Sequence, residues 1–308
     1  MIAFLFPGQG SQVVGMGREL LSEVPALSAV YQEAQEVLGY DIQQLCFEGP
    51  VERLNQTEYT QPALLVTSWA AYQLMQDAPW APAAVAGHSL GEYTALLAAG
   101  GLRFRDAVGL VQKRGQYMAE AVLPGSGLVA AILGLAEEDV RVVCQEAESA
   151  GIVAPANLNS PGQTVIAGEK TAVEKALEIA KARGAKRVMP LPVSVPVHTP
   201  LMQVAANRLK KDIDSLSWSD LKVPLINNVE AKAIQSADDV RHSLVRQLPS
   251  PVRWQDTIMT MSKMGIRHFI EIGPGKVLTG LVKRIAPDAK TWNVYDRTSY
   301  DSVRAQLI

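Results

Sequence analysis

Short apolar runs that end in glycine turns recur along this chain. Residues 2–6 end at Pro-Gly, residues 83–86 run into Gly-His-Ser-Leu-Gly, and residues 267–272 end at Gly-Pro-Gly. Runs of this length, closed by turn residues, are typical of buried strands. Helical segments are predicted between them, at 63–77, 92–99 and 104–120. Alternating strands and helices predict an α/β fold, with a mostly parallel sheet and helices on both faces.

The pattern changes in the middle of the chain. Residues 128–133, 152–157, 163–167 and 186–191 read as strands, and residues 136–150 and 170–184 read as helices. Strand–helix–strand–strand–helix–strand is the ferredoxin-like order. We therefore expect a ferredoxin-like small subdomain at 127–192, inserted into a larger α/β domain made of 1–126 and 193–308.

Composition narrows the function classes. The chain has 308 residues, 48% of them hydrophobic, which is enough for a sizeable core. A formal net charge of −2 with 19% charged residues argues against a nucleic-acid or membrane partner. There is no basic, apolar leader and no long apolar span, and Cys46 and Cys144 lack metal-ligand spacing. We expect reduced thiols and a cytoplasmic location.

Gly87-His88-Ser89-Leu90-Gly91 is a G-x-S-x-G sequence between a predicted strand and a predicted helix. In a hydrolase-like α/β fold, this spacing places a serine hydroxyl on a sharp turn, where it is exposed as a nucleophile. The N–H of Leu90 would then face a developing oxyanion, and the helix N-terminus would add partial positive charge. The alternative is a purely structural turn.

A nucleophilic serine needs a base, and the chain has four histidines. His88 lies inside the turn and is expected to point away from the hydroxyl, His242 lies in a polar helical stretch, and His268 lies in an apolar strand. His198 follows Pro-Val and precedes Thr-Pro, so it sits in a rigid loop that could hold one imidazole. The alternative for His198 is a packed loop histidine.

Two further positions are candidates for the same site. Gln9, in Phe-Pro-Gly-Gln-Gly-Ser-Gln, follows the first strand and could supply the second oxyanion donor, or it could belong to an ordinary turn. Arg114 lies on the second helix after Ser89. The sequence alone does not distinguish Arg114 from Arg103 or Arg105, and the alternative is that Arg114 lies on a solvated face of its helix.

Taken together, these motifs resemble the malonyl-CoA:acyl carrier protein transacylases of fatty-acid synthesis, and acyltransferase domains of polyketide synthases are similar. The resemblance covers nearly the whole chain. It is carried, in the family's order, by F-P-G-Q-G-S-Q, T-Q-P-A-L, G-H-S-L-G-E-Y, K-R-G-Q-Y-M, A-N-L-N-S-P-G-Q, V-S-V-P-V-H, V-R-Q-L and I-E-I-G-P-G-K-V-L-T-G-L.

The resemblance implies a role for each matching residue. Ser89 would carry the malonyl group, His198 would be the base, and Gln9 and Leu90 would form the oxyanion hole. Arg114 would hold the malonyl carboxylate in a bidentate pair. The backbone carbonyl of Gln247 would accept from the second imidazole nitrogen, which removes the need for an acidic third member. The substrate-binding residues implied are Asn159, Gln163, Val197 and Met118.

The resemblance also implies the partners: malonyl-CoA as donor, holo acyl carrier protein as acceptor, and no metal or redox cofactor. An acidic carrier protein would dock near Lys186 and Arg187 or near Lys276 and Lys283. Val197 departs from the Ser or Phe common at this position, which leaves the choice between malonyl and methylmalonyl open. The alternatives are a polyketide or malonate decarboxylase acyltransferase, a serine thioesterase or hydrolase, and a non-catalytic carrier-docking subunit.

Overall fold

A mostly parallel sheet forms the centre of the larger part of the molecule. The computed structural model describes residues 1–193 and 195–307. The strands of this sheet are β1 (Ile2–Phe6), β2 (Ala84–Gly87), β7 (Leu225–Ile226), β8 (Ala233–Ile234), β9 (His268–Ile272) and β10 (Lys290–Val294). They lie in the order β10-β9-β1-β2-β7-β8, and β8 alone pairs antiparallel with its neighbour.

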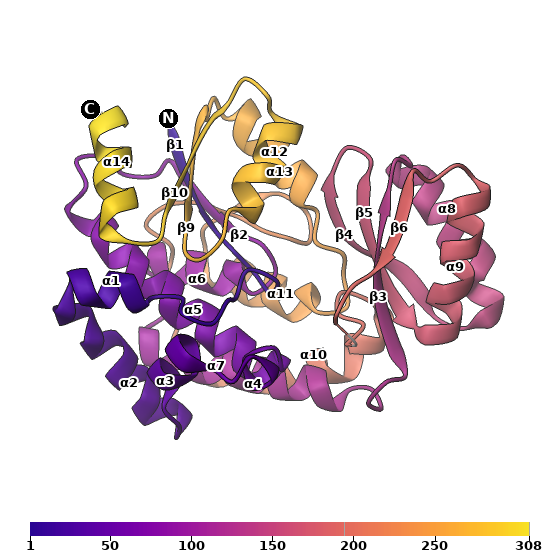
Figure 1. Ribbon diagram of the computed structural model, residues 1–308, viewed down its shortest axis with the longest axis horizontal. Helices are drawn as coiled ribbons and strands as arrows, with labels where there is room; N and C mark the ends of the chain where they lie inside the picture. Colours follow the sequence, from indigo (N-terminus) through magenta and orange to yellow (C-terminus); the bar gives the residue numbers. More distant parts are fainter. Residues whose placement is uncertain (194, 308) are drawn as a thin grey trace.

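Helices cover both faces of this sheet. They are α1 (Arg18–Glu23), α2 (Ser28–Leu38), α3 (Ile42–Glu48), α4 (Val51–Leu54), α5 (Thr57–Gln73), α6 (Gly91–Ala98), α7 (Phe104–Glu120), α10 (Gln203–Ser215), α11 (Ala237–Gln247), α12 (Trp254–Lys263), α13 (Val277–Ile285) and α14 (Arg297–Leu307) (Figure 1). Short 3-10 helices occur at Pro25–Leu27, Leu74–Asp77, Glu148–Ala150 and Pro200–Met202.

Strand β1 shows why the strands read as continuous apolar runs. Phe4 and Phe6 pack into the core cluster that includes residues of α5 and α7. Ala3 and Leu5 pack into the other cluster, with residues of α12 and α13. Because successive side chains of a strand point to opposite faces, a strand covered on both sides is apolar at nearly every position.

The second sheet is antiparallel and contains β3 (Gly127–Leu133), β4 (Val153–Ser160), β5 (Gln163–Glu169) and β6 (Arg187–Pro190). Its order is β4-β5-β3-β6, and α8 (Glu137–Ala147) and α9 (Lys170–Ala182) pack on one face. This is the expected ferredoxin-like arrangement, and Figure 1 shows it beside the larger sheet. The domain boundaries expected at 126/127 and 192/193 stay predictions.

Strand β4 of the smaller sheet bonds to the segment between α11 and α12 of the larger part. The Val252 N–H donates to the Ala156 carbonyl at 2.9 Å, and the Leu158 N–H donates to the Val252 carbonyl at 2.9 Å. On the face away from α8 and α9, Val129 and Ala131 pack with Leu191 and Val193. The apolar face left free by the two helices therefore looks toward the larger sheet.

Helix boundaries agree with the sequence pattern in some places and differ in others. Helix α7 covers 104–120 as expected, whereas α5 begins at Thr57 rather than at 63 and runs through Pro62. A proline normally marks a helix start, because it lacks an N–H. Here the first turn of α5 is held against α7: a Cβ on Gly115 would lie 2.6 Å from the Glu58 Cα. No helix in the described ranges is both long and apolar enough to cross a bilayer.

Candidate active site

Ser89 occupies a strained turn between β2 and α6. Its φ is 52°, in the left-handed region that non-glycine residues rarely adopt. A Cβ on Gly87 would lie 1.9 Å from the Gly91 carbonyl carbon, and a Cβ on Gly91 would lie 2.0 Å from the Phe6 carbonyl oxygen. Both flanking positions of the motif must therefore be glycine, and the turn presents the serine hydroxyl outward.

Two side chains hold this turn in place. The Ser89 N–H donates to Asn228 Oδ1 at 2.7 Å, and Asn228 Nδ2 donates to the Gly87 carbonyl at 2.7 Å. Gln247 Nε2 donates to the Ser89 carbonyl at 3.0 Å. These bonds satisfy backbone groups on both sides of the nucleophile, so they offset the cost of its backbone conformation.

His198 reaches the same hydroxyl from the loop before Pro200–Met202. Its Nε2 lies 2.7 Å from Ser89 Oγ, and its Nδ1 lies 2.9 Å from the Gln247 carbonyl oxygen and 3.1 Å from the Ser250 carbonyl oxygen. Carbonyls only accept, so Nδ1 carries the proton and Nε2 faces the serine with its lone pair. Burial, followed by the nearby Arg114 charge, lowers the pKa of His198 to about 3. The imidazole is therefore neutral and available as a base.

Arg114 is the third side chain at this hydroxyl. It is 1% exposed, and its Nη2 donates to Ser89 Oγ at 3.1 Å and to Gln247 Oε1 at 2.9 Å. Its Nη1 donates to Gln61 Oε1 at 2.7 Å, and the guanidinium lies 5.4 Å from the centre of the Tyr93 ring. None of the ion pairs within the described ranges includes it. A buried guanidinium whose hydrogen-bond partners are two amide oxygens and one hydroxyl can pair with an anionic ligand.

The turn after β1 packs directly on the elbow. A Cβ on Gly8 would lie 2.2 Å from the His88 carbonyl oxygen, so only glycine permits the approach. Gln9 thereby joins the cavity at Ser89, with its side-chain oxygen accepting from Thr57 Oγ1 at 3.0 Å. The Leu90 N–H, beside the nucleophile, has no acceptor among the described residues. The backbone at Gln9 and the backbone at Leu90 therefore both border the cavity at the Ser89 hydroxyl.

A cavity of about 100 Å³ contains the Ser89 hydroxyl and lies between the two sheets. Its lining combines the polar group just described with apolar side chains: Gln9, His88, Ser89, Leu90, Arg114, Met118, Val129, Asn157, Leu191, Val193, Val195, Val197 and His198. A small, largely apolar space around one cation suits a short acyl group with a charged end.

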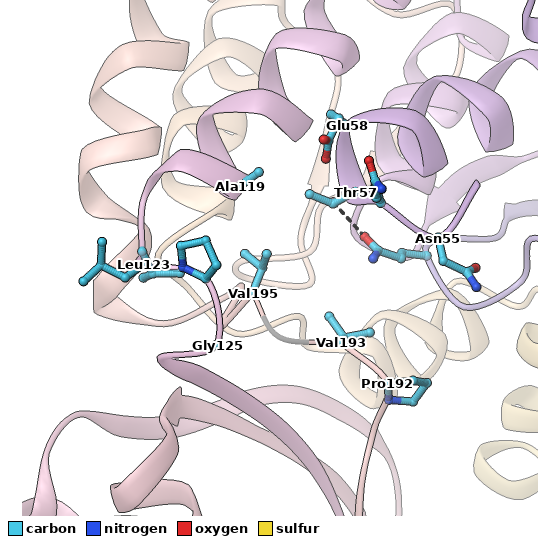
Figure 2. Close-up of a pocket in the computed structure, with 13 residues that line it drawn as sticks. Asn55, Thr57, Glu58, Ala119, Leu123, Gly125, Pro192, Val193 and Val195 are labelled. Carbon is cyan, nitrogen blue, oxygen red and sulfur yellow. Dashed lines mark hydrogen bonds between the residues drawn. The ribbon is translucent and has the colours of Figure 1, made fainter. Parts of the chain in front are cut away.

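A second cavity of about 260 Å³ adjoins the first and shares Gln9, Val193 and Val195 with it. Figure 2 shows Thr57 and Asn55 on one side, Leu123 on the opposite side, and Val193 and Val195 between them. Val193 and Val195 therefore line both cavities, which are two parts of one hollow. Ser194, in the V-S-V-P-V-H segment, lies outside the described residues.

Two residues implied as substrate contacts lie elsewhere. Asn159 Oδ1 is 2.9 Å from His88 Nε2, and Gln163 Oε1 accepts from Arg284 Nη1 at 2.6 Å. Neither lines the cavity at Ser89, whereas Asn157 does. β4 has register shifts between Pro155 and Asn157 and between Leu158 and Ser160, and simple strand alternation does not predict which asparagine faces inward across such irregularities.

The side chains of the other three histidines make their contacts elsewhere than at the Ser89 hydroxyl. His88 packs against Trp254, His242 is exposed, and His268 stacks on Trp292 at the rim of the sheet. The candidate docking residues are all exposed: Lys186, Arg187, Lys276 and Lys283.

Sequence reasoning missed several groups of the cluster, above all Glu92. This carboxylate is wholly buried in the first turn of α6, and burial raises its pKa to about 7. The available signal was its place in G-H-S-L-G-E-Y, and Gln61 likewise lies in T-Q-P-A-L.

Comparison with known proteins agrees with this geometry. The family model described as acyl transferase domain matches residues 3–296. The malonyl CoA-acyl carrier protein transacylase of Escherichia coli K12 is 50% identical over 284 residues, 92% of each chain. That of Bacillus subtilis 168 is 49% identical over 296 residues, 96% of this chain and 93% of that protein.

Solved structures give the same result. The malonyl CoA-acyl carrier protein transacylase from Coxiella burnetii superposes with a TM-score of 0.97 at 45% identity, covering 99% of this chain and 97% of that one. A malonyl-transacylase solved in complex with a type II PKS acyl-carrier protein gives 0.97 at 46% identity, covering 99% of each. With its fold and its motifs matched from end to end, this chain belongs to the acyl transferase family, among the malonyl CoA-acyl carrier protein transacylases.

Proposed function

We propose that this protein transfers the malonyl group of malonyl-CoA to the phosphopantetheine thiol of an acyl carrier protein, through a malonyl ester on Ser89. One observation carries the proposal. Ser89 Oγ lies 2.7 Å from the imidazole Nε2 of His198 and 3.1 Å from the guanidinium Nη2 of Arg114. His198 can activate the hydroxyl as a base, and the Arg114 guanidinium lies where the free carboxylate of a malonyl group on Ser89 would bind.

The first half-reaction loads the enzyme. His198 Nε2 takes the Ser89 proton as Oγ bonds to the thioester carbonyl carbon, and the backbone N–H groups of Leu90 and Gln9 stabilise the oxyanion. The carbon–sulfur bond then breaks, and the departing coenzyme A sulfur takes the proton from His198. The two carbonyls at Nδ1 stabilise the imidazolium during this step, so no carboxylate is required.

The second half-reaction repeats these steps with the carrier. The pantetheine thiol gives its proton to His198 and attacks the ester carbonyl, and collapse of the adduct returns the proton to Ser89 Oγ. The pathway uses no metal or redox cofactor. We expect the carrier to dock at the exposed basic residues Lys186 and Arg187 or Lys276 and Lys283. The expected cytoplasmic location stays a prediction.

The test is a panel of malonyl-, methylmalonyl- and acetyl-CoA, each with holo acyl carrier protein. We expect transfer from malonyl-CoA, a malonyl adduct on Ser89 by mass spectrometry when no carrier is present, and neither with Ser89→Ala. Rapid thioester hydrolysis without carrier would instead indicate a hydrolase. Competition between fatty-acid and polyketide carriers identifies the client, and absence of any adduct would refute the covalent mechanism.

A further inference from the structure

The mechanism above makes no use of Glu92, although this acidic side chain is hydrogen-bonded to Gln247 beside the reacting groups. The side chain is 0% exposed. Its Oε2 accepts from Gln247 Nε2 at 2.6 Å and from the Asn228 N–H at 3.3 Å. Burying a carboxylate costs free energy, so we looked for a role of Glu92 among the groups that it contacts.

Both partners of Glu92 contact the reacting groups. Asn228 binds the backbone on either side of the nucleophile, at the Ser89 N–H and the Gly87 carbonyl. Gln247 binds the Ser89 carbonyl and the Arg114 guanidinium with its side chain, and binds His198 with its backbone carbonyl. The Glu92 carboxyl group is thus hydrogen-bonded directly to the two residues, Asn228 and Gln247, that hold the nucleophile, the base and the cation.

We propose that Glu92 is a positioning residue that fixes the amide of Gln247 in one orientation, and so places Arg114 against Ser89; the inference rests on the proposed function. The NH₂ end of the Gln247 amide faces one obligate acceptor, the Ser89 carbonyl, and Glu92 Oε2 gives it a second. Glu92 Oε2 accepts from both the Asn228 N–H and Gln247 Nε2, so it holds the NH₂ end of Gln247 on this side. The oxygen end is then directed at the guanidinium, where an NH₂ group would repel it.

Glu92→Gln tests this orientation with little change in volume. A glutamine at this position can turn its own NH₂ toward Gln247, which replaces one of the two acceptors at Gln247 Nε2 with a donor and displaces the amide from Arg114. Glu271→Gln is the matched control. Glu271 is also 0% exposed, and it accepts from the Leu278 and Thr279 N–H groups at 3.1 and 2.8 Å at the start of α13. It therefore measures the cost of losing a buried carboxylate outside the site.

Each variant is measured for melting temperature, for malonyl and acetyl transfer, and for the rate at which a serine-directed sulfonyl fluoride modifies Ser89. With Glu92→Gln, we expect malonyl transfer to fall about 10- to 100-fold, as for a misplaced binding group, and the malonyl-to-acetyl ratio to fall several-fold. With Glu271→Gln, the ratio should equal the wild-type value. A wild-type ratio in Glu92→Gln would overturn the inference.

Gln247→Met keeps the backbone carbonyl and removes the amide, so it should lower the ratio as Glu92→Gln does. It also carries the test if Glu92→Gln fails to fold. The double variant should lose no more than the larger single loss, since both changes break one link. Additive losses would overturn the route through Gln247. If wild-type protein transfers no malonyl group at all, the proposed function fails instead.

Discussion

Replacing Arg114 with alanine should change which donor the enzyme uses. In the wild-type protein, the guanidinium contacts the nucleophile at 3.1 Å and is 1% exposed. A malonyl group brings its carboxylate into the same buried space, whereas an acetyl group brings only a methyl. The alanine variant would leave the carboxylate buried without a partner, and would leave acetyl binding unaffected by that loss.

The size of the effect follows from the bonds that are lost. A bidentate pair supplies two charge-assisted hydrogen bonds, each worth about 1.5–3 kcal/mol, or about 3–6 kcal/mol together. At about 1.4 kcal/mol per tenfold, kcat/KM for malonyl-CoA should fall about 10²- to 10⁴-fold. Acetyl transfer should not lose its base, because the Arg114 charge lowers the pKa of His198 and its removal raises that pKa.

The assay compares the two donors in a single preparation. Arg114→Ala also unpairs Gln61 and Gln247, so part of the protein could unfold, but the malonyl-to-acetyl ratio does not depend on the folded fraction. Arg114→Lys keeps a charge without the fork, and should recover only part of the ratio. Arg105→Ala, an exposed residue of the same helix, should leave the ratio unchanged. Equal losses for both donors in Arg114→Ala would refute its role in specificity.

Four further outcomes follow from the same geometry. Gly8→Ala should lower transfer by more than about 100-fold, because its Cβ would lie 2.2 Å from the His88 carbonyl oxygen and force the oxyanion segment away; unchanged kinetics would contradict this packing. Val197→Ala should raise methylmalonyl transfer relative to malonyl transfer by about 10-fold in the donor panel. The change removes two methyl groups from the cavity wall and so makes room for the extra methyl group of the donor. The pKa of His198, lowered to about 3, places the acid limb of Ser89 sulfonylation below about pH 5, and a limb near its ordinary value of 6.5 would contradict the burial argument. The pKa of Glu92 is raised from 4.5 to about 7, so the native state binds this proton more tightly than the unfolded state does. In urea titrations, the free energy of unfolding of the wild type relative to Glu92→Gln should therefore fall by up to about 3 kcal/mol as the pH rises from 4.5 to 7. An increase over this pH range would contradict the argument.

The local pattern of this sequence predicts much of the framework. Helix α7 and the succession of strands and helices over residues 127–190 follow from periodicity and turn residues, because these depend on neighbours along the chain. The Gly-x-Ser-x-Gly spacing similarly predicts the elbow, since the crowding at Gly87 and Gly91 arises within a strand–turn–helix unit and the strand beside it. The roles of His198, Arg114 and Gln247, which lie far from Ser89 in the chain, were assigned from the family resemblance. That resemblance predicted the roles but not the distances and directions between the groups.

Tertiary structure alone decided how the site is connected. Arg103, Arg105 and Arg114 are alike in sequence, and only the packing of α7 against α5 and α6 buries the last of them beside Ser89. The same holds for Glu92, whose partner Gln247 lies 155 residues away, and for Ser89 and His198, which are 109 residues apart. Periodicity reports which face of an element is buried, but a hydrogen bond depends on the position and direction of two groups brought together by separate elements. That information exists only once the sheets and helices have packed.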